Sequence, residues 1–361
     1  MPVLRLFTPV LVVLLLSPLT RATPALAAPA ELPEVWSVAA PGPAPWRLHP
    51  LTSALLIEDS AGSVTAIDVA NGQALWSQQM GAPLSVRPRE HNGSTVLTAG
   101  LKCVAVDVAT GGVLDTRRLP SPAAAPAVLH GDKLFVLTLA GALHTFSRGG
   151  AQLWMYRGVE GLGENLVFVP TPDRPLVLVT DGAGRVLALP ASSGVPTSTA
   201  WERSLGAEPA GAMQLGVDGT LHAALRDGQL VALAANSGRI LWRHALPGMP
   251  GAAASRAGEV IVAGGGWGLH ACRADTGKLL WELSDPALPR ASNSSSTLLR
   301  TGKDRSSWAR TRDGMQLTLP THMPELLIGD LLIAWHNDRV RAYSAAHAKL
   351  ASSTNSSGAL N

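Results

Sequence analysis

The stretch Arg226–Trp242 reads RDGQLVALAANSGRILW, and its pattern predicts the fold. It holds a turn, an apolar run, a second turn and a final segment that contains tryptophan. The same order recurs in NGQALW, which ends at Trp76, in GGAQLW, which ends at Trp154, and in TGKLLW, which ends at Trp281. A unit that recurs at a fixed spacing indicates an array of repeats, and the array determines the architecture.

The end positions of successive units define the period. In chain order they are Trp36, Trp76, Asp115, Trp154, Trp201, Trp242, Trp281 and a degenerate position at Thr318. Most are about 40 residues apart, a spacing that with several short strands per unit is typical of β-propeller blades. The glycine of the second turn suits a hairpin, because tight hairpin turns often need a positive φ.

The two ends of the chain complete each other. Trp36 lies in EVWSV, which has the pattern of a last strand but no earlier strands of the same unit before it. Gly329–Ser344 has the pattern of the first strands of a unit, and the repeat pattern ends at Leu350 before any final tryptophan. We therefore expect an all-β fold, a single eight-bladed β-propeller whose ring is closed by the N-terminal strand. Seven blades are the alternative if Arg290–Pro320 folds irregularly. Closure matters because exposed strand edges invite aggregation.

The first residues are typical of an export signal. Arg5 precedes the apolar run Val10–Leu16, and Ala25-Leu26-Ala27 forms a small-residue cleavage site. The run is shorter than the roughly 20 residues of a membrane-spanning helix. An uncleaved anchor is the alternative. The expected organisation is a signal peptide over 1–27, the propeller over 28–350 and a disordered tail over 351–361.

Charge and motifs exclude several classes of function. The formal charge is +3, and removing residues 1–27 takes away two arginines and no acid, which leaves +1. No long basic run marks a nucleic-acid binder. The ten histidines have no metal-binding spacing, and no nucleophile elbow, phosphate-binding loop or calcium loop is present.

The two cysteines are expected to be buried free thiols. Cys103 and Cys272 fall in opposite units of the array, farther apart than the roughly 4.4–6.8 Å between Cα atoms that a disulfide requires. Since the first cysteine is Cys103, no lipid anchor is expected near the cleavage point.

The repeat resembles that of the PQQ-like (quinoprotein-type) β-propeller family, whose pattern G-x-[VL]-x-A-[LI]-D followed by [TN]-G-x-x-L-W is matched here by GSVTAID and NGQALW. The resemblance covers nearly the whole mature chain. It implies that Asp68 and Asp107 stabilise turns. It also implies that the tryptophans dock between adjacent blades as structural residues, namely Trp36, Trp76, Trp154, Trp201, Trp242 and Trp281.

In function the chain resembles BamB, the propeller component of the β-barrel assembly machinery. This implies a non-enzymatic, monomeric scaffold whose partners are envelope proteins. The chain departs from that family in lacking the lipidated cysteine, so a periplasmic or secreted protein without a lipid anchor is expected instead. No catalytic, cofactor-binding or metal-binding residue and no cofactor is expected. Binding is expected on the loop after each tryptophan, such as Leu246–Gly251, because a rigid scaffold presents loops accurately. The alternatives are a small-molecule or glycan-binding propeller that uses its central channel, and a PQQ-dependent dehydrogenase.

Overall fold

The inner strands of the repeats are buried on both faces. Every side chain is buried in β3 (Ala54–Glu58) and in β7 (Ser94–Ala99). A strand that is buried on both faces belongs to a sheet with a covering layer on each side. The protein is seen here in a computed structural model, which describes residues 34–191, 194, 196, 198–246, 254–265, 268–284, 298–299, 305–309, 316–320, 325–328, 331–336 and 339–344.

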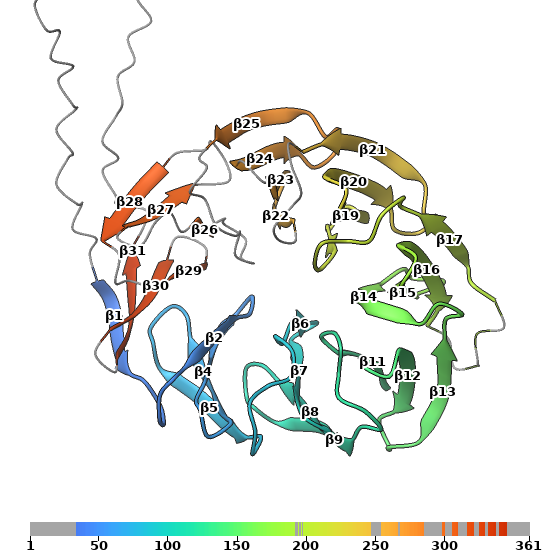
Figure 1. Cartoon of the computed structure of the whole chain (residues 1–361). Coiled ribbons are helices and arrows are strands. Elements are labelled where there is room, and N and C mark those ends of the chain that lie inside the picture. Colours follow the sequence, from blue (N-terminus) through green and yellow to red (C-terminus); the bar gives the residue numbers. More distant parts are fainter. Residues whose placement is uncertain are drawn as a thin grey trace, which may run out of the picture.

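The described residues form eight antiparallel sheets placed around a common centre (Figure 1). In sheets 1 to 7 the strands follow chain order from the centre outward. Sheet 1 is β2 (Arg47–Pro50), β3, β4 (Ser63–Asp68) and β5 (Ala74–Gln79); sheet 2 is β6 (Glu90–His91), β7, β8 (Lys102–Asp107) and β9 (Val113–Arg118); sheet 3 is β10 (Val128–His130), β11 (Lys133–Thr138), β12 (Ala142–Ser147) and β13 (Gln152–Arg157); sheet 4 is β14 (Leu162–Val169), β15 (Leu176–Asp181), β16 (Arg185–Pro190) and β17 (Trp201–Ser204).

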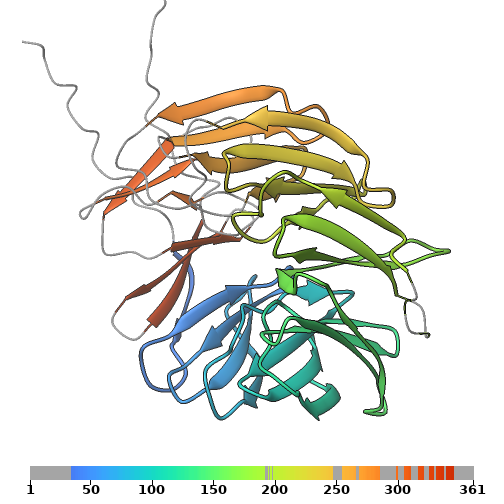
Figure 2. The same ribbon diagram turned by 45° about the vertical axis from the view of Figure 1, so that its right-hand side comes forward.

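The remaining sheets continue the same order. Sheet 5 is β18 (Gln214–Leu215), β19 (Thr220–Ala224), β20 (Gln229–Ala234) and β21 (Ile240–Ala245); sheet 6 is β22 (Ser255–Ala257), β23 (Val260–Gly265), β24 (Gly268–Arg273) and β25 (Leu279–Ser284); sheet 7 is β26 (Leu298–Leu299), β27 (Arg305–Ala309) and β28 (Gln316–Pro320); sheet 8 is β29 (Glu325–Ile328), β30 (Leu331–His336), β31 (Arg339–Ser344) and β1 (Glu34–Ala39). Seen obliquely in Figure 2, the sheets are twisted, as expected from the natural twist of β-strands.

Sheet 8 joins the two ends of the described chain. β1 pairs antiparallel with β31, so that Trp36 lies opposite Ala342. Side chains add to the ladder, because the Arg339 Nε donates to the Ser37 hydroxyl at 2.7 Å. In Figure 1 the blue β1 lies along the dark-red β31 at the outer edge of the sheet.

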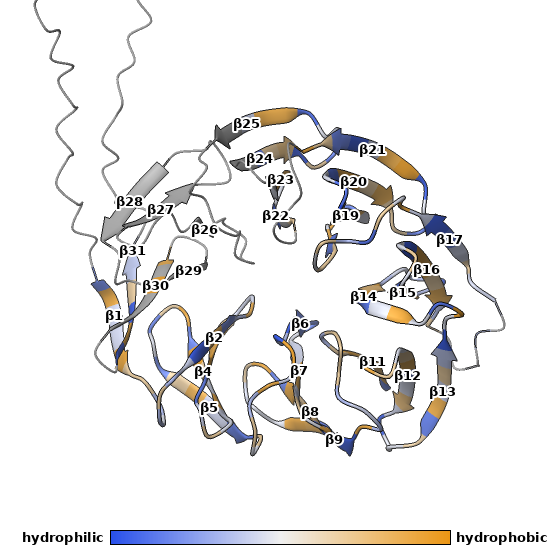
Figure 3. Ribbon diagram, viewed as in Figure 1, coloured by the Kyte–Doolittle hydropathy of each residue, from blue (hydrophilic) through white to orange (hydrophobic). Residues whose placement is uncertain are grey.

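The core is divided among the spaces between consecutive sheets. Leu56 and Val64 of sheet 1 pack with Leu97 of sheet 2, whereas the adjacent Leu55 and Ile57 pack with the strands of sheet 8. Successive side chains of a strand point to opposite faces, so one strand serves two cores. This explains why the inner strands are continuous apolar runs. The outer strands are more mixed: β21 is apolar at its start and polar at its end (Figure 3).

The third and fourth strands of five sheets share one irregularity. Their register shifts directly after the turn, for example between Ala66 and Ile67 in sheet 1 and between Ala232 and Leu233 in sheet 5; the others lie in sheets 2, 3 and 6. A bulge strengthens the local twist. The outer strand is thereby turned as it leaves the glycine turn, and an irregular edge is a poor template for pairing with another chain.

The structure confirms the all-β prediction and the individual strands behind it. The predicted segments at 62–69 and 228–233 correspond to β4 and β20. Cys103 and Cys272 are buried free thiols in sheets 2 and 6, and burial raises their pKa values to about 12 and about 11. The predicted signal peptide and tail lie outside the described residues. No helix among the described residues has the length and apolar character needed to cross a membrane.

Candidate functional site

Three of the repeat tryptophans make the same contact with the following sheet. The indole N–H of Trp36 donates to the Val69 carbonyl at 2.7 Å, and that of Trp76 donates to the Val108 carbonyl at 2.7 Å. Trp242 repeats this contact with the Ala274 carbonyl at 3.0 Å. Each acceptor lies directly after the third strand of the next sheet. A buried N–H usually needs such a partner.

The other three tryptophans occupy the same strand position with different surroundings. Trp154 is 2% exposed and lies 6.1 Å from the Phe135 ring, centroid to centroid. Trp201 packs into the core between sheets 4 and 5, and its indole nitrogen is buried without a hydrogen bond. Trp281 is half-buried on β25. The structure therefore brings each of the six tryptophans to an outer strand and brings no two of them together.

The turn glycines make room for these indoles. A Cβ on Gly111 would lie 2.4 Å from Trp76 of the preceding sheet, and the backbone there has φ +70°. The same crowding is found at Gly72 with Trp36, Gly238 with Trp201 and Gly277 with Trp242. Gly150 also has a positive φ, +94°, but nothing lies within 4 Å of its Cβ position. The outer strand that precedes Gly150 carries Asp115 in the tryptophan position.

Asp115 replaces the indole by an ion pair. Its carboxylate accepts a hydrogen bond from Arg117, and the two side chains are 4% and 5% exposed. Arg117 also donates to the Ser147 carbonyl of sheet 3 at 2.9 Å and lies 4.7 Å above the Phe146 ring. A guanidinium over an aromatic ring is attracted by the ring's π face. The Arg117 guanidinium, paired with Asp115 of its own strand, thus contacts sheet 3 where indoles make the contact between other pairs of sheets.

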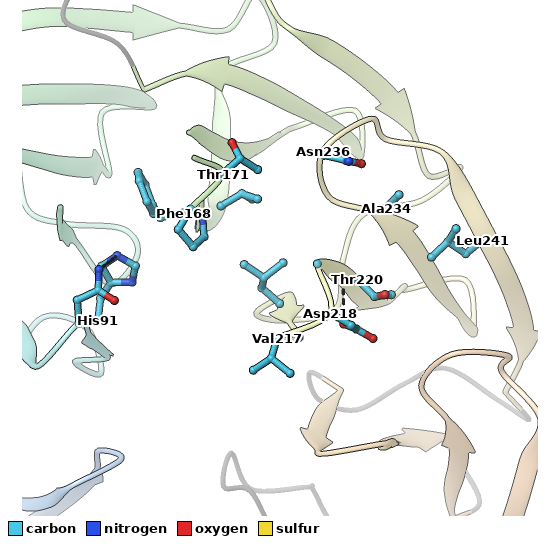
Figure 4. Close-up of a pocket in the computed structure, with 15 residues that line it drawn as sticks. His91, Phe168, Thr171, Val217, Asp218, Thr220, Ala234, Asn236 and Leu241 are labelled. Carbon is cyan, nitrogen blue, oxygen red and sulfur yellow. Dashed lines mark hydrogen bonds between the residues drawn. The ribbon is translucent and has the colours of Figure 1, made fainter. Parts of the chain in front are cut away.

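A cleft of about 540 Å³ opens at one face of the ring (Figure 4). Most of its lining comes from the segments around the turn between the first two strands of three sheets: His91 and Asn92, Phe168 to Thr171, and Leu215 to Thr220. Ala234, Asn236 and Leu241 of sheet 5 complete it. Asn92 and Gly93 have φ values of +48° and +70°, which is the hairpin turn favoured by Asn-Gly. Val217, at the tip of its loop, is fully exposed on the side facing His91 and Phe168 (Figure 4).

Two histidines and a phenylalanine from three sheets meet beside this cleft. His91 Nε2 lies 3.4 Å from His130 Nδ1, and the His130 ring lies 4.2 Å from the Phe168 ring, centroid to centroid. Burial lowers the pKa of His91, and His130 lowers it further. Burial also lowers the pKa of His130, and Lys133 adds to this. The imidazoles are therefore neutral at neutral pH, and either can donate or accept one hydrogen bond.

A polar cluster joins sheets 5 and 6 at the other wall. Arg256 binds Asp218 through two hydrogen bonds of 3.0 and 2.9 Å, which lower the pKa of Asp218 to about 2. The Arg256 guanidinium also lies 3.4 Å from His222 Nδ1. His222 Nε2 must then carry the proton, and it donates to the Ala274 carbonyl at 2.9 Å. Burial lowers the pKa of His222 to about 4.

A buried carboxylate of sheet 1 is bonded to the loop that leads to sheet 2. Glu58 is 1% exposed and accepts hydrogen bonds from Arg47 at 2.8 Å and from the Leu84 amide at 2.7 Å. Its other oxygen lies 2.7 Å from His49 Nε2. Burial alone raises the pKa of Glu58, but these partners outweigh it and the pKa is lowered. Arg47 thus pairs with Glu58 as Arg256 pairs with Asp218. Among the described residues no three His, Cys, Asp or Glu side chains are grouped as metal ligands.

Sequence reasoning missed these polar contacts. One of them could have been found from the repeat: His91 and His130 are 39 residues apart, which is one repeat period, so they occupy equivalent positions in adjacent units. Asp115 was recognised as the departure from tryptophan, and Arg117 two residues later lies on the same face of the strand. Asp68 and Asp107 were expected at turns, and their carboxylates accept from the Ala70 and Thr110 amides at 2.7 and 2.8 Å.

A family model matches most of the chain. The family described as outer membrane protein assembly factor BamB matches overlapping segments at residues 34–125, 60–218, 104–253 and 196–307. No curated protein matches the sequence. Among solved structures, BamB from Moraxella catarrhalis is 21% identical with a TM-score of 0.65, and the alignment covers 88% of this chain and 99% of that one.

Two further structures share the fold at lower identity. The computationally designed protein Ika8 is 14% identical with a TM-score of 0.63, over 87% of this chain and 99% of that one. The C-terminal WD40 domain of Sif2 is 9% identical with a TM-score of 0.65, over 88% and 99%. Such likenesses concern the fold alone. Because the family match spans most of the chain, this protein belongs to the PQQ-like repeat family described as outer membrane protein assembly factor BamB.

Proposed function

We propose that this chain is an exported, non-enzymatic β-propeller that acts as a protein-interaction scaffold in the assembly of outer-membrane proteins. The observation that carries the proposal is the BamB family match over residues 34–307. The export-signal pattern at the N-terminus supports a periplasmic or secreted location, without a lipid anchor. In this role the loops after the outer strands contact a partner, because loops on a rigid frame are the usual place of binding.

The frame in this proposal is a closed propeller of eight blades. Its support is the number of sheets, eight among the described residues, and the pairing of β1 with β31. The six tryptophans serve as docking residues between blades, with Asp115 and Arg117 in that role between sheets 2 and 3. Pairing with β1 covers the edge of β31, which suits a monomeric scaffold because exposed strand edges promote association.

The test is an in-cell cross-linking experiment. Tagged full-length protein is expressed in its own cells, cross-linked and purified, and the attached proteins are identified by mass spectrometry. The proposal predicts reproducible recovery of an outer-membrane barrel or its assembly factors. Recovery of nothing above a tag-only control would contradict a stable scaffold role. Reduction of a dye after addition of PQQ and Ca²⁺ would contradict the non-enzymatic part.

One observation favours a second candidate function. The cleft beside His91 and Val217 has a volume of about 540 Å³, within the ~300–1,000 Å³ of small-molecule sites. A small-molecule or glycan-binding propeller would use this cleft. A ligand that binds only the folded state raises the melting temperature, so a thermal-shift screen against sugars and envelope metabolites distinguishes this function. If the cleft binds a ligand, that ligand raises the melting temperature of the wild type, and Val217→Asp abolishes the rise.

A further inference from the structure

The loop between β5 and β6 carries two arginines that differ from the other arginines near the centre of the ring. Arg87 and Arg89 are exposed, whereas Pro88 between them is buried. A residue before proline is held in an extended conformation, and the alternating burial agrees with this. The two side chains therefore project from one short extended segment, directly before the innermost strand of sheet 2.

Hydrogen bonds fix this loop on both neighbouring sheets. The Leu84 amide donates to Glu58 of sheet 1 at 2.7 Å. The Ser85 amide donates to the Thr98 carbonyl at 2.7 Å, and the Ser85 hydroxyl accepts from the Gly100 amide at 2.9 Å. The Arg89 carbonyl accepts from the Thr95 hydroxyl at 3.0 Å. These bonds fix the backbone of the short segment that carries both arginines.

Among the described residues, no acidic side chain is paired with either arginine. Within the described part of the chain neither Arg87 nor Arg89 forms an ion pair, whereas Arg47 is paired with Glu58 and Arg256 with Asp218. The surrounding protein lowers the pKa of both guanidinium groups, and the charge of Arg87 lowers that of Arg89 further. Both side chains are exposed, directly before the innermost strand of sheet 2. Two like charges held there are unfavourable unless a bound anion offsets them.

We propose that Arg87 and Arg89 form a binding site for an acidic, extended peptide segment of a partner protein. Arginine binds carboxylates through two parallel hydrogen bonds. Residues i and i+2 of an extended chain are about 7 Å apart, so alternate carboxylates of an extended peptide match the spacing of the two arginines. A single phosphate would have to draw both guanidinium groups to one point. The inference rests on the proposed scaffold function and names the chemistry of the segment that the scaffold binds.

The test measures peptide binding by fluorescence anisotropy with the purified full-length protein. The probe is a fluorescein-labelled octapeptide of alternating Glu and Ser, and the comparison peptide alternates Lys and Ser. The test variant is Arg87→Gln/Arg89→Gln. The matched control is Arg118→Gln/Arg157→Gln, which removes the same charge from exposed positions on β9 and β13. We expect the wild type to bind the acidic peptide and not the basic one. The test variant should bind the acidic peptide at least tenfold more weakly, and the control variant should bind it as the wild type does.

A stability measurement separates a binding role from a structural one. Because the pair is uncompensated, the test variant should melt at the same temperature as the wild type or higher. A clear fall in melting temperature would overturn the assignment. Equal binding of the acidic probe by wild type and test variant would also overturn it, as would displacement of the probe by inorganic phosphate at lower concentration than by unlabelled peptide.

The failure of this inference is distinguishable from the failure of the proposed function. If assembly factors co-purify equally with the wild type and the test variant, the scaffold function stands and the arginine site is wrong. If the acidic probe binds through the two arginines but no assembly factor co-purifies with the wild type, the site stands and the proposed function is wrong.

Discussion

At the scale of single residues, the repeat is a pairing of an indole with a glycine one sheet further on. Gly111 serves two needs at once: its φ of +70° suits glycine, and its missing Cβ leaves room for Trp76. Gly150 serves only the first need, because no atom lies within 4 Å of its Cβ position. The same sequence motif therefore carries different constraints, depending on the residue in the previous outer strand.

This difference gives a matched pair of substitutions. Gly150→Ala should cost about 1–2 kcal/mol, the usual strain of a left-handed residue other than glycine. Gly111→Ala adds a clash with Trp76 and should cost clearly more, by about another 1–3 kcal/mol from overpacking. Urea denaturation of both variants measures the two free energies of unfolding. Equal losses would show that the indole does not need the space above Gly111.

The ion pair that replaces tryptophan should behave as a buried pair. Asp115→Asn leaves the Arg117 charge buried without its partner, so we expect a loss of about 3–5 kcal/mol. Replacing both residues by leucine removes the charges together, and the double variant should recover at least half of that loss. Thermal unfolding followed by circular dichroism measures both. A double variant less stable than the single variant would show that Arg117 acts mainly through Ser147 and Phe146.

At the scale of elements, the contact between sheets 5 and 6 depends on a neutral imidazole. His222 donates to the Ala274 carbonyl and accepts from Arg256, and protonation would place a second positive charge beside that guanidinium. Its pKa is about 4 in the folded protein, below the ~6.5 of an unfolded histidine. The unfolded state therefore binds the proton first as the pH falls.

The sign of the pH dependence follows directly. Stability from His222 is fully present above pH ~6.5 and is lost as the pH falls toward about 4, a loss on the order of 3 kcal/mol. His91, His130 and His144 have lowered pKa values as well, so they add to the same slope. Urea denaturation at several pH values should show a flatter slope in His222→Gln than in the wild type. An unchanged slope would contradict the account of His222.

The sequence predicted the elements better than the contacts between them. Strands such as β4 and β20 were evident because their apolar runs end at turn glycines. The tryptophan period located the outer strands. The pair Asp218–Arg256 was not predictable, because only the packing of sheet 6 on sheet 5 brings the two side chains within reach. The pair His49–Glu58 joins adjacent strands of sheet 1, and it depends on their register. Arg87 and Arg89 looked like ordinary loop residues, since a missing counter-charge is visible only in three dimensions.

At the scale of the whole molecule, sheet 8 joins residues about 300 positions apart, as the ion pair of Arg341 with Glu34 illustrates. A chain that lacks Glu34–Ala39 would expose the edge of β31, and such edges promote association. We expect a lower melting temperature and concentration-dependent association in light scattering. Addition of a synthetic peptide with the sequence of β1 should restore the melting temperature of the full chain and suppress the association. Unchanged melting and a monomeric truncated chain would show that β1 does not close the ring.

We propose that the loops after the outer strands contact a partner in outer-membrane protein assembly. Site-specific photo-cross-linking in the protein's own cells detects this contact. A photoreactive residue replaces Pro83, which is exposed in the loop after β5, or, as the control, Thr116, which is exposed on the outer strand β9. We predict an adduct with an outer-membrane barrel or one of its assembly factors from position 83 and none from position 116. Adducts from position 116 alone, or from neither position, would contradict the account.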